Sequence, residues 1–161
     1  MTSASTRIVL IRHGEAEPSF ADDKSRCLTD RGRQQVMHAS KMLVDLVNDY
    51  KGFDCALVSP YTRTQQTFDI LTIYLKVRQK INCSVITPMS SIVDAQREVF
   101  SQLDNCRSLL VVTHMPLVSF LTGELCHLDS PPLFMTSSFA VIDINTDEGA
   151  VKLVDLVHQH D

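Results

Sequence analysis

The sequence has no excess of positive charge, no long hydrophobic run and no paired cysteine motif, and each absence excludes a class of protein. Its 161 residues carry 15 Lys and Arg against 19 Asp and Glu, a net charge of −4, whereas a nucleic-acid or anionic-membrane surface has a basic footprint. No stretch is long enough to span a membrane, and the first apolar run is too short for the core of a signal peptide. We therefore expect neither nucleic acid nor a membrane as a partner.

Cysteines and metal-binding motifs are also sparse. The five cysteines are scattered, odd in number and contain no C-x-x-C pair, which predicts reduced thiols rather than a disulfide framework. The sequence has no HExxH motif and no cluster of carboxylates, so we expect no metal and no other cofactor. These features favour a cytoplasmic protein. The cysteines are Cys27, Cys55, Cys83, Cys106 and Cys126.

Short β-branched segments alternate with longer segments of helical period, which is typical of βαβ units and a largely parallel sheet. With 44% hydrophobic residues, the chain suits one domain spanning residues 1–161. The expected fold is a three-layer α/β/α sandwich with an antiparallel hairpin at its C-terminal edge. The predicted strands are 7–11, 55–58, a weaker one at 83–86, 109–112, 139–144 and 151–157. Thr29-Asp30 is the expected N-cap of the first helix, and Ser59 is the expected cap of the second, with Pro60 at its first position. Two further helices are expected at 92–103 and 116–126.

Three predicted strands end in residues that bind anions. Arg12 and His13 follow the first strand, Arg63 lies on the first turn of the helix after the second, and His114 follows the very apolar strand at 109–112. Ligands of open α/β sheets bind outside the carboxyl ends of the strands. We therefore expect these four side chains to meet in one site.

The residue types at these strand ends indicate phosphoryl transfer. Two arginines can donate paired hydrogen bonds to phosphate oxygens, and helix N-termini near Ser59 and Pro116 would add partial positive charge. A neutral imidazole is one of the few side chains that can attack phosphorus and form a covalent intermediate at neutral pH. The combination predicts a phosphohistidine intermediate.

Around these residues the chain resembles the histidine phosphatase superfamily, also called the phosphoglycerate mutase-like or RHG superfamily. Within it, the chain is similar to the small SixA-type phosphohistidine phosphatases. The resemblance covers nearly the whole sequence and is therefore specific. The matching segments are LIRHGEA at 10–16, RCLTDRG at 26–32, SPYTRTQQT at 59–67, THMPLV at 113–118, ELC at 124–126 and PPLF at 131–134.

The resemblance implies a role for each site residue. His13 would be the nucleophile, and Arg12, Arg63 and His114 would bind and neutralise the transferring phosphoryl group. Arg26 matches a further phosphate-contacting arginine of the SixA type. The implied reaction forms a phosphohistidine enzyme, which water then hydrolyses, without a metal.

The chain also departs from other branches of the superfamily. Met115 follows His114 where the acid-phosphatase branch has an aspartate, and residues 87–91 contain no glutamate where other relatives place one. The proton donor could be Glu15, Asp94 or water, or the reaction could proceed without one. A weakly acidic site favours an easy leaving group, and imidazole has a pKa of about 6.5 against about 15.7 for a water-like alkoxide.

The function expected from these observations is removal of phosphate from a histidine of a protein. The resemblance suggests a phosphotransfer domain or sensor kinase of a multistep phosphorelay as the partner, and we expect a monomer. Two alternatives stay open at this point: a phosphatase of small phosphate esters, and a catalytically silent module that only binds phosphoproteins.

Overall fold

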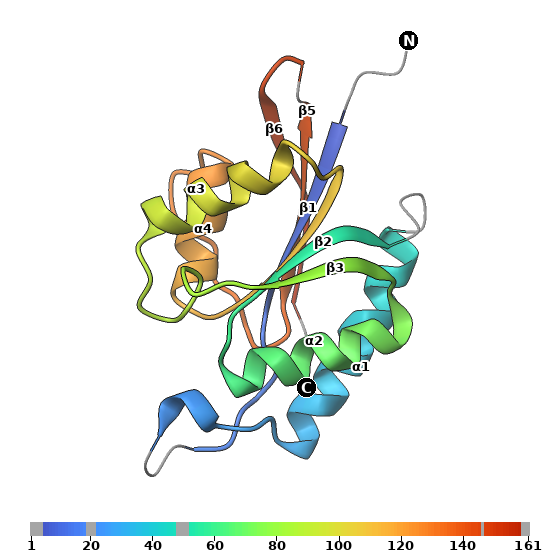
Figure 1. Cartoon of the computed structure of the whole chain (residues 1–161), viewed down its shortest axis with the longest axis vertical. Coiled ribbons are helices and arrows are strands. Elements are labelled where there is room, and N and C mark those ends of the chain that lie inside the picture. Colours follow the sequence, from blue (N-terminus) through green and yellow to red (C-terminus); the bar gives the residue numbers. More distant parts are fainter. Residues whose placement is uncertain (1–4, 19–21, 48–51, 146, 159–161) are drawn as a thin grey trace.

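A six-stranded sheet runs through the centre of the molecule, and helices cover both of its faces (Figure 1). The computed structural model describes residues 5–18, 22–47, 52–145 and 147–158. Its elements are β1 (Ser5–Arg12), the 3-10 helix η1 (Asp23–Ser25), α1 (Asp30–Leu46), β2 (Phe53–Val58), α2 (Thr62–Tyr74), β3 (Val77–Asn82), α3 (Ile92–Leu103), β4 (Ser108–Thr113), α4 (Leu117–Leu125), β5 (Phe139–Asn145) and β6 (Ala150–Val157).

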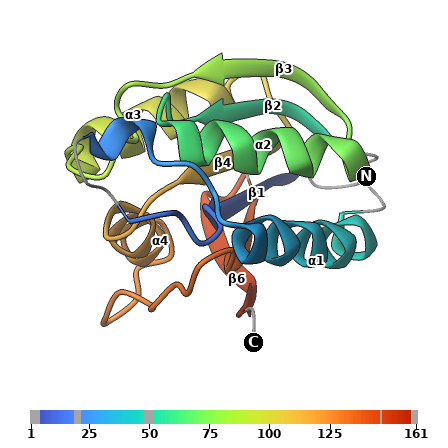
Figure 2. The same ribbon diagram turned by 90° about the horizontal axis from the view of Figure 1, so that it is seen from below.

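The strands lie in the order β3-β2-β4-β1-β5-β6. The pairs β2–β3, β2–β4 and β1–β4 are parallel, whereas β1–β5 and β5–β6 are antiparallel. This confirms the expected α/β fold, mostly parallel with an antiparallel C-terminal hairpin at one edge. The carboxyl ends of β1, β2 and β4 therefore meet at one end of the sheet, which Figure 2 views from below.

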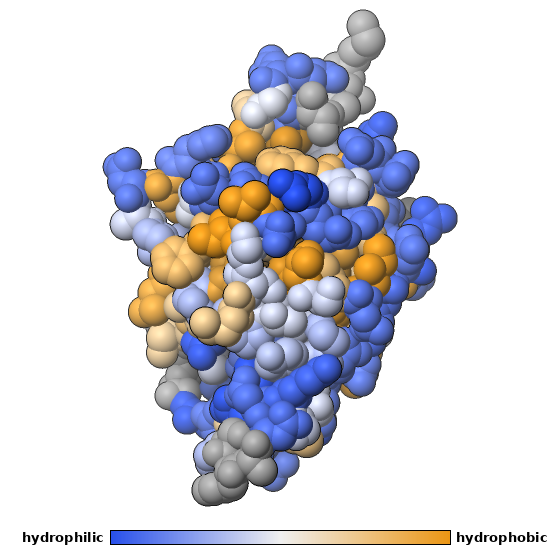
Figure 3. Space-filling view, turned by 60° about the vertical axis from the view of Figure 1, so that its left-hand side comes forward, coloured by the Kyte–Doolittle hydropathy of each residue, from blue (hydrophilic) through white to orange (hydrophobic). Residues whose placement is uncertain are grey.

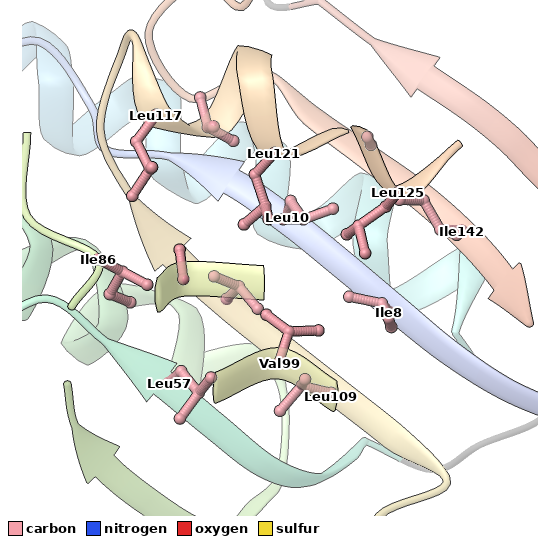
Figure 4. Close-up of a cluster of buried hydrophobic side chains, with 14 of the residues drawn as sticks. Ile8, Leu10, Leu57, Ile86, Val99, Leu109, Leu117, Leu121, Leu125 and Ile142 are labelled. Carbon is pink, nitrogen blue, oxygen red and sulfur yellow. The ribbon is translucent and has the colours of Figure 1, made fainter. Parts of the chain in front are cut away.

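The core consists of two layers because alternate strand residues point to opposite faces of the sheet. In β1, Ile8 and Leu10 pack with α3 and α4, and Val9 and Ile11 pack with α1 and α2. Figure 4 shows the α3–α4 layer, in which Leu10 lies beside Leu121 of α4. Burial on both faces explains why the central strands read as continuous apolar runs.

Helix α1 begins where the sequence predicts. The Thr29 hydroxyl accepts a hydrogen bond from the N–H of Gly32 at 2.9 Å and thereby caps the helix. The apolar face contains Val36, Leu43 and Val47, all of which are buried.

Helix α2 begins later than predicted, at Thr62, with Tyr61 at the N-cap and no side-chain cap. The expectation that Ser59 caps this helix is wrong. The Ser59 N–H donates to the carbonyl of Val112 at 3.1 Å, so Ser59 still continues the ladder between β2 and β4. Its hydroxyl is consequently free for another role.

The predicted strand at 83–86 is also wrong, because the strand of this region is β3 and ends at Asn82. Edge strand β3 is mostly exposed and polar, so it lacks the apolar signal of a strand. Cys83 and Ile86 are buried because their loop packs against the α3–α4 layer. The helices predicted at 92–103 and 116–126 are α3 and, within one residue at each end, α4.

Exposed apolar side chains occur mainly on the side of the sheet covered by α3 and α4. Figure 3 shows apolar residues interspersed with polar ones over this side of the molecule. Within the part of the chain that the structure describes, no helix has the length and apolar character needed to cross a membrane. The exposed apolar residues on α3, on α4 and in the loop after it are Val93, Phe100, Phe120, Leu128, Leu133 and Met135.

Two glycines allow the loop after β1 to pack directly against the start of α1. A Cβ on Gly32 would lie 2.1 Å from the carbonyl oxygen of Glu15, and one on Gly14 would lie 2.6 Å from the carbonyl oxygen of Gly32. Real Cβ atoms do not approach this closely, so a larger residue would push the loop and the helix apart. This contact fixes the loop that carries His13.

We expect Gly32→Ala to lower the free energy of unfolding by about 3 kcal/mol, because backbone must move to admit the methyl group. Gly149→Ala is the matched control: the added methyl meets nothing within 4 Å, although φ is +69°, so its cost should be about 1 kcal/mol. Urea unfolding of both variants measures the difference. Equal losses would contradict the close contact of Gly32 with Glu15.

Candidate active site

Four side chains from three strand ends form a cluster at the carboxyl end of the sheet, which we call the histidine–arginine cluster. Arg12 is the last residue of β1, His13 follows it, Arg63 lies in the first turn of α2, and His114 follows β4. The rings of His13 and His114 lie edge to face with centroids 5.2 Å apart. Arg63 Nε lies 3.2 Å from His13 Nε2. The structure thus brings together the four residues singled out from the sequence.

The His13 ring is held in one tautomer. Its Nδ1 lies 2.7 Å from the carbonyl oxygen of Gly14, which can only accept, so the ring proton is on Nδ1. Nε2 therefore carries a lone pair, to which Arg63 Nε–H donates. Burial, together with the charges of Arg63 and Arg12, lowers the pKa of His13 to about 3. The ring is a neutral imidazole near pH 7, with its nucleophilic nitrogen facing the arginine.

His114 is held by the hydroxyl of Ser59. Nε2 of this histidine lies 2.7 Å from Ser59 Oγ. Ser59 Oγ also accepts the N–H of Tyr61 at 3.4 Å. When the Ser59 hydroxyl donates to Nε2, the ring proton of His114 lies on Nδ1. The pKa of His114 is lowered to about 2, mainly by burial and to a smaller extent by the charges of His13 and Arg63. The ring of His114 is therefore neutral near pH 7, and in this tautomer its Nδ1–H is a donor without a partner.

Three buried side-chain polar atoms of the described residues have no hydrogen-bond partner: Arg12 Nε, His114 Nδ1 and Ser137 Oγ. All three belong to the surroundings of His13. Arg12 Nη1 donates to the carbonyl of Phe134 at 2.9 Å, and the Ser137 N–H donates to the carbonyl of His13 at 3.0 Å. Buried polar groups are normally paired. Unpaired donors around a nucleophilic imidazole indicate that the site is built for an oxyanion.

Asp23 of η1 links the cluster to Arg26. Its Oδ2 lies 3.2 Å from Arg63 Nη2, and its carbonyl oxygen accepts from Arg63 Nη1 at 2.7 Å. Its Oδ1 accepts from Arg26 Nη1 at 3.0 Å, and Arg26 Nε donates to the carbonyl of Glu17 at 2.6 Å. Hydrogen bonds from Arg26 and Arg63 hold the pKa of Asp23 below its usual value. Arg26 thus reaches the cluster through a shared carboxylate.

The two carboxylates considered as proton donors lie elsewhere. Glu15 accepts from Thr29 Oγ1 at 3.1 Å and pairs with Arg31 at 3.1 Å, so it belongs to the start of α1. Asp94 lies in the first turn of α3 and pairs with Arg97 at 3.7 Å. Within the described ranges, neither carboxylate is hydrogen-bonded to the histidine–arginine cluster. Those ranges also contain no group of three or more His, Cys, Asp or Glu placed to hold a metal ion.

Sequence reasoning missed three residues of this site. From the sequence, Ser59 is expected to cap a helix. Its position at the end of one strand, beside the end of a second strand that is followed by His114, is a signal that could have placed its hydroxyl in the site. Ser137 is fully buried with φ of 61°, and nothing in its sequence context indicates this. Asp23 lies three residues before Arg26, which predicts their ion pair but not the contact with Arg63.

Comparisons with known proteins identify the family of this chain. Residues 8–83 match the family model of the histidine phosphatase superfamily, branch 1. The "Phosphohistidine phosphatase SixA homolog" of Haemophilus influenzae is 33% identical over 141 residues, which cover 83% of this chain and 85% of the relative. The chain belongs to the histidine phosphatase superfamily. The family resemblance of the sequence motifs is thereby confirmed.

Two further histidine phosphatases show how far the likeness extends. "Phosphohistidine phosphatase SixA" of Escherichia coli K12 is 29% identical over 143 residues, 86% of each chain. A solved structure, the protein histidine phosphatase SixA complexed with tungstate, has a TM-score of 0.84 and 25% identity and covers 95% of this chain and 97% of the other. As a member of the superfamily, the chain is a SixA-like hydrolase.

The two buried histidines should make stability depend on pH. Because their pKa values in the folded protein, about 3 and about 2, lie below the unfolded value of about 6.5, the unfolded chain binds protons first as the pH falls. Stability is therefore full above about pH 6.5 and decreases below it by up to about 1.4 kcal/mol per pH unit for each histidine.

Urea unfolding between pH 7.5 and pH 5 measures this slope. His13→Ala should remove about half of it, since one of the two histidines is gone. A free energy of unfolding in the wild type that stays constant over this range would contradict the neutral, buried state of both rings.

Proposed function

We propose that this chain is a phosphohistidine phosphatase that transfers the phosphoryl group to Nε2 of His13. The observation that carries the proposal is the lone pair on Nε2 of a buried neutral imidazole, which accepts a hydrogen bond from Arg63 and lies near the unpaired Arg12 Nε and His114 Nδ1. The relatives named SixA support the substrate class, since they are phosphohistidine phosphatases by name.

In the first step, the lone pair of His13 Nε2 attacks phosphorus and the bond from phosphorus to the substrate nitrogen breaks. The substrate ring, protonated by solvent on its other nitrogen, departs as neutral imidazole. Arg63 Nε–H, which donates to Nε2 in the ligand-free site, becomes a donor to a phosphoryl oxygen. Arg12 Nε–H and His114 Nδ1–H gain the partner that they lack. The donors stabilise charge on the phosphoryl oxygens of the transition state.

In the second step, water attacks phosphorus, the bond to His13 Nε2 breaks and orthophosphate leaves. The phosphorylated ring keeps its proton on Nδ1 and is therefore cationic, and the Gly14 carbonyl stabilises this charge. A cationic ring is a good leaving group because it departs as neutral imidazole. The proton lost by water goes to solvent or to the departing phosphate.

The substrate follows from the leaving group. The ring of a phosphohistidine takes the proton that it needs from solvent near neutral pH, since the pKa of an imidazole is about 6.5, and then departs as neutral imidazole. No carboxylate hydrogen-bonded directly to His13 or His114 in the described ranges has to supply a proton. The side chains of Arg26 and Asp23 are 27% and 52% exposed, so a phosphate on a protein surface can approach. We propose a histidine-phosphorylated phosphotransfer domain or sensor kinase as the partner, in the cytoplasm, where the five cysteines stay free.

Trapping the intermediate tests the proposal. Wild type incubated with a ³²P-phosphorylated phosphotransfer domain should acquire an acid-labile, base-stable label, and His13→Ala should acquire none. Turnover of this substrate should exceed that of p-nitrophenyl phosphate. Equal or faster turnover of small esters would instead indicate an ester phosphatase. If wild type acquires no label and binds the phosphoprotein with the same affinity as His13→Ala, the chain is a silent binding module.

Ser59→Ala should reduce kcat about tenfold, because Nε2 of the buried His114 loses its partner and the ring is no longer fixed with its proton on Nδ1. Steady-state kinetics on the same phosphoprotein measure the effect. Ser91→Ala is the matched control, since Ser91 caps α3, away from the cluster. It should lower stability by about 1 kcal/mol and leave kcat unchanged. A Ser59→Ala enzyme with the kcat of wild type would rule out this role of Ser59.

A further inference from the structure

Arg63 uses two different edges of its guanidinium group. Nε–H and one Nη2–H lie along the side edge, whereas Nη1 and the other Nη2–H form the end edge. The side edge faces His13, with Nε at 3.2 Å from Nε2. The end edge is held by Asp23, through its carbonyl oxygen at 2.7 Å and its carboxylate at 3.2 Å. The two contacts do not compete for the same donors.

The position of η1 explains how one residue holds this edge. η1 packs against the N-terminal end of α2, at the lower end of the molecule in Figure 1. The Asp22 carboxylate caps η1 by accepting from the N–H of Lys24 at 3.2 Å, which leaves the next carboxylate, that of Asp23, directed at the arginines. The remaining oxygen of Asp23 binds Arg26.

We propose that Asp23 is the positioning residue of the phosphate site. It holds the end edge of Arg63 so that the side edge faces the nucleophile, and it keeps Arg26 beside Arg63 at the same time. The inference rests on the proposed function, since it assigns to Asp23 the orientation of a phosphate-binding arginine. Asp23 has no hydrogen bond to His13 or His114 and acts through the arginines.

A purely electrostatic role for Asp23 predicts the opposite result. If the carboxylate only offset the positive charge of the two arginines, its removal would strengthen oxyanion binding. If it positions Arg63, its removal weakens binding and turnover even though the site becomes more positive. The sign of the effect therefore distinguishes positioning from charge balance.

The experiment compares Asp23→Asn and Asp23→Ala with Asp22→Asn, which removes the same charge one residue away and keeps the side-chain oxygen that caps η1. Asparagine keeps one acceptor oxygen, so its side chain cannot accept from both arginines; the carbonyl oxygen of residue 23 still accepts from Arg63 Nη1 in each variant, and only the side-chain contacts are lost. We expect kcat/KM on the phosphoprotein to fall about tenfold in Asp23→Asn and up to about a hundredfold in Asp23→Ala, mainly through kcat. The Kd for tungstate, measured by calorimetry, should rise in both, and Asp22→Asn should match wild type.

A second measurement does not depend on turnover. The Nε–H of Arg63 is buried against His13 Nε2, so its exchange with water, followed by ¹⁵N NMR of the arginine side chains, should be slow in wild type and Asp22→Asn and faster in Asp23→Asn. Unchanged exchange would overturn the proposal. Three other results would also overturn it. Asp23→Asn would bind tungstate as tightly as wild type or more tightly, it would keep the kcat of wild type, or Asp22→Asn and Asp23→Asn would have equal effects.

Failure of the proposed function gives a different result. In that case wild type itself would neither bind tungstate nor form a phosphoenzyme on His13. If wild type binds tungstate and forms the phosphoenzyme, and Asp23→Asn behaves identically, only the positioning role of Asp23 is rejected.

Discussion

The hydrogen bond between His13 Nδ1 and the carbonyl of Gly14 is the constraint on which the rest of the site depends. A buried histidine could carry its proton on either nitrogen, and only one choice leaves a nucleophile facing the arginines. The backbone makes that choice, so no second side chain is needed to orient the ring. The close approach of Gly14 to α1 keeps the carbonyl in place.

Positive charge at the site is concentrated in a protein whose net charge is −4. Burying a guanidinium is costly unless its donors are paired. Arg12 is paired with the carbonyl of Phe134, and Arg63 with Asp23 and with the His13 lone pair. Burial keeps His13 neutral by lowering its pKa, and the charges of Arg63 and Arg12 add to this effect while the same pairing holds both arginines in place.

The sequence was most informative where both faces of the sheet are buried and where strands end. The runs of β1 and β4 predicted their strands because such strands are apolar throughout, and the position of Arg12, His13 and His114 followed from the geometry of parallel sheets. Edge strand β3 was missed because its exposed side chains are polar. Asp23 was missed because its contact with Arg63 joins residues 40 apart through a loop, for which periodicity carries no signal.

The place of β1 between β4 and β5 has a consequence for how the protein is made. The strand that leads to His13 pairs with partners that follow it at long distance along the chain, such as Arg7 with Asp143, 136 residues later. A nascent chain on the ribosome therefore cannot pair both edges of β1 until β5 has emerged. Enzymatic activity should consequently arise only after synthesis has passed β5.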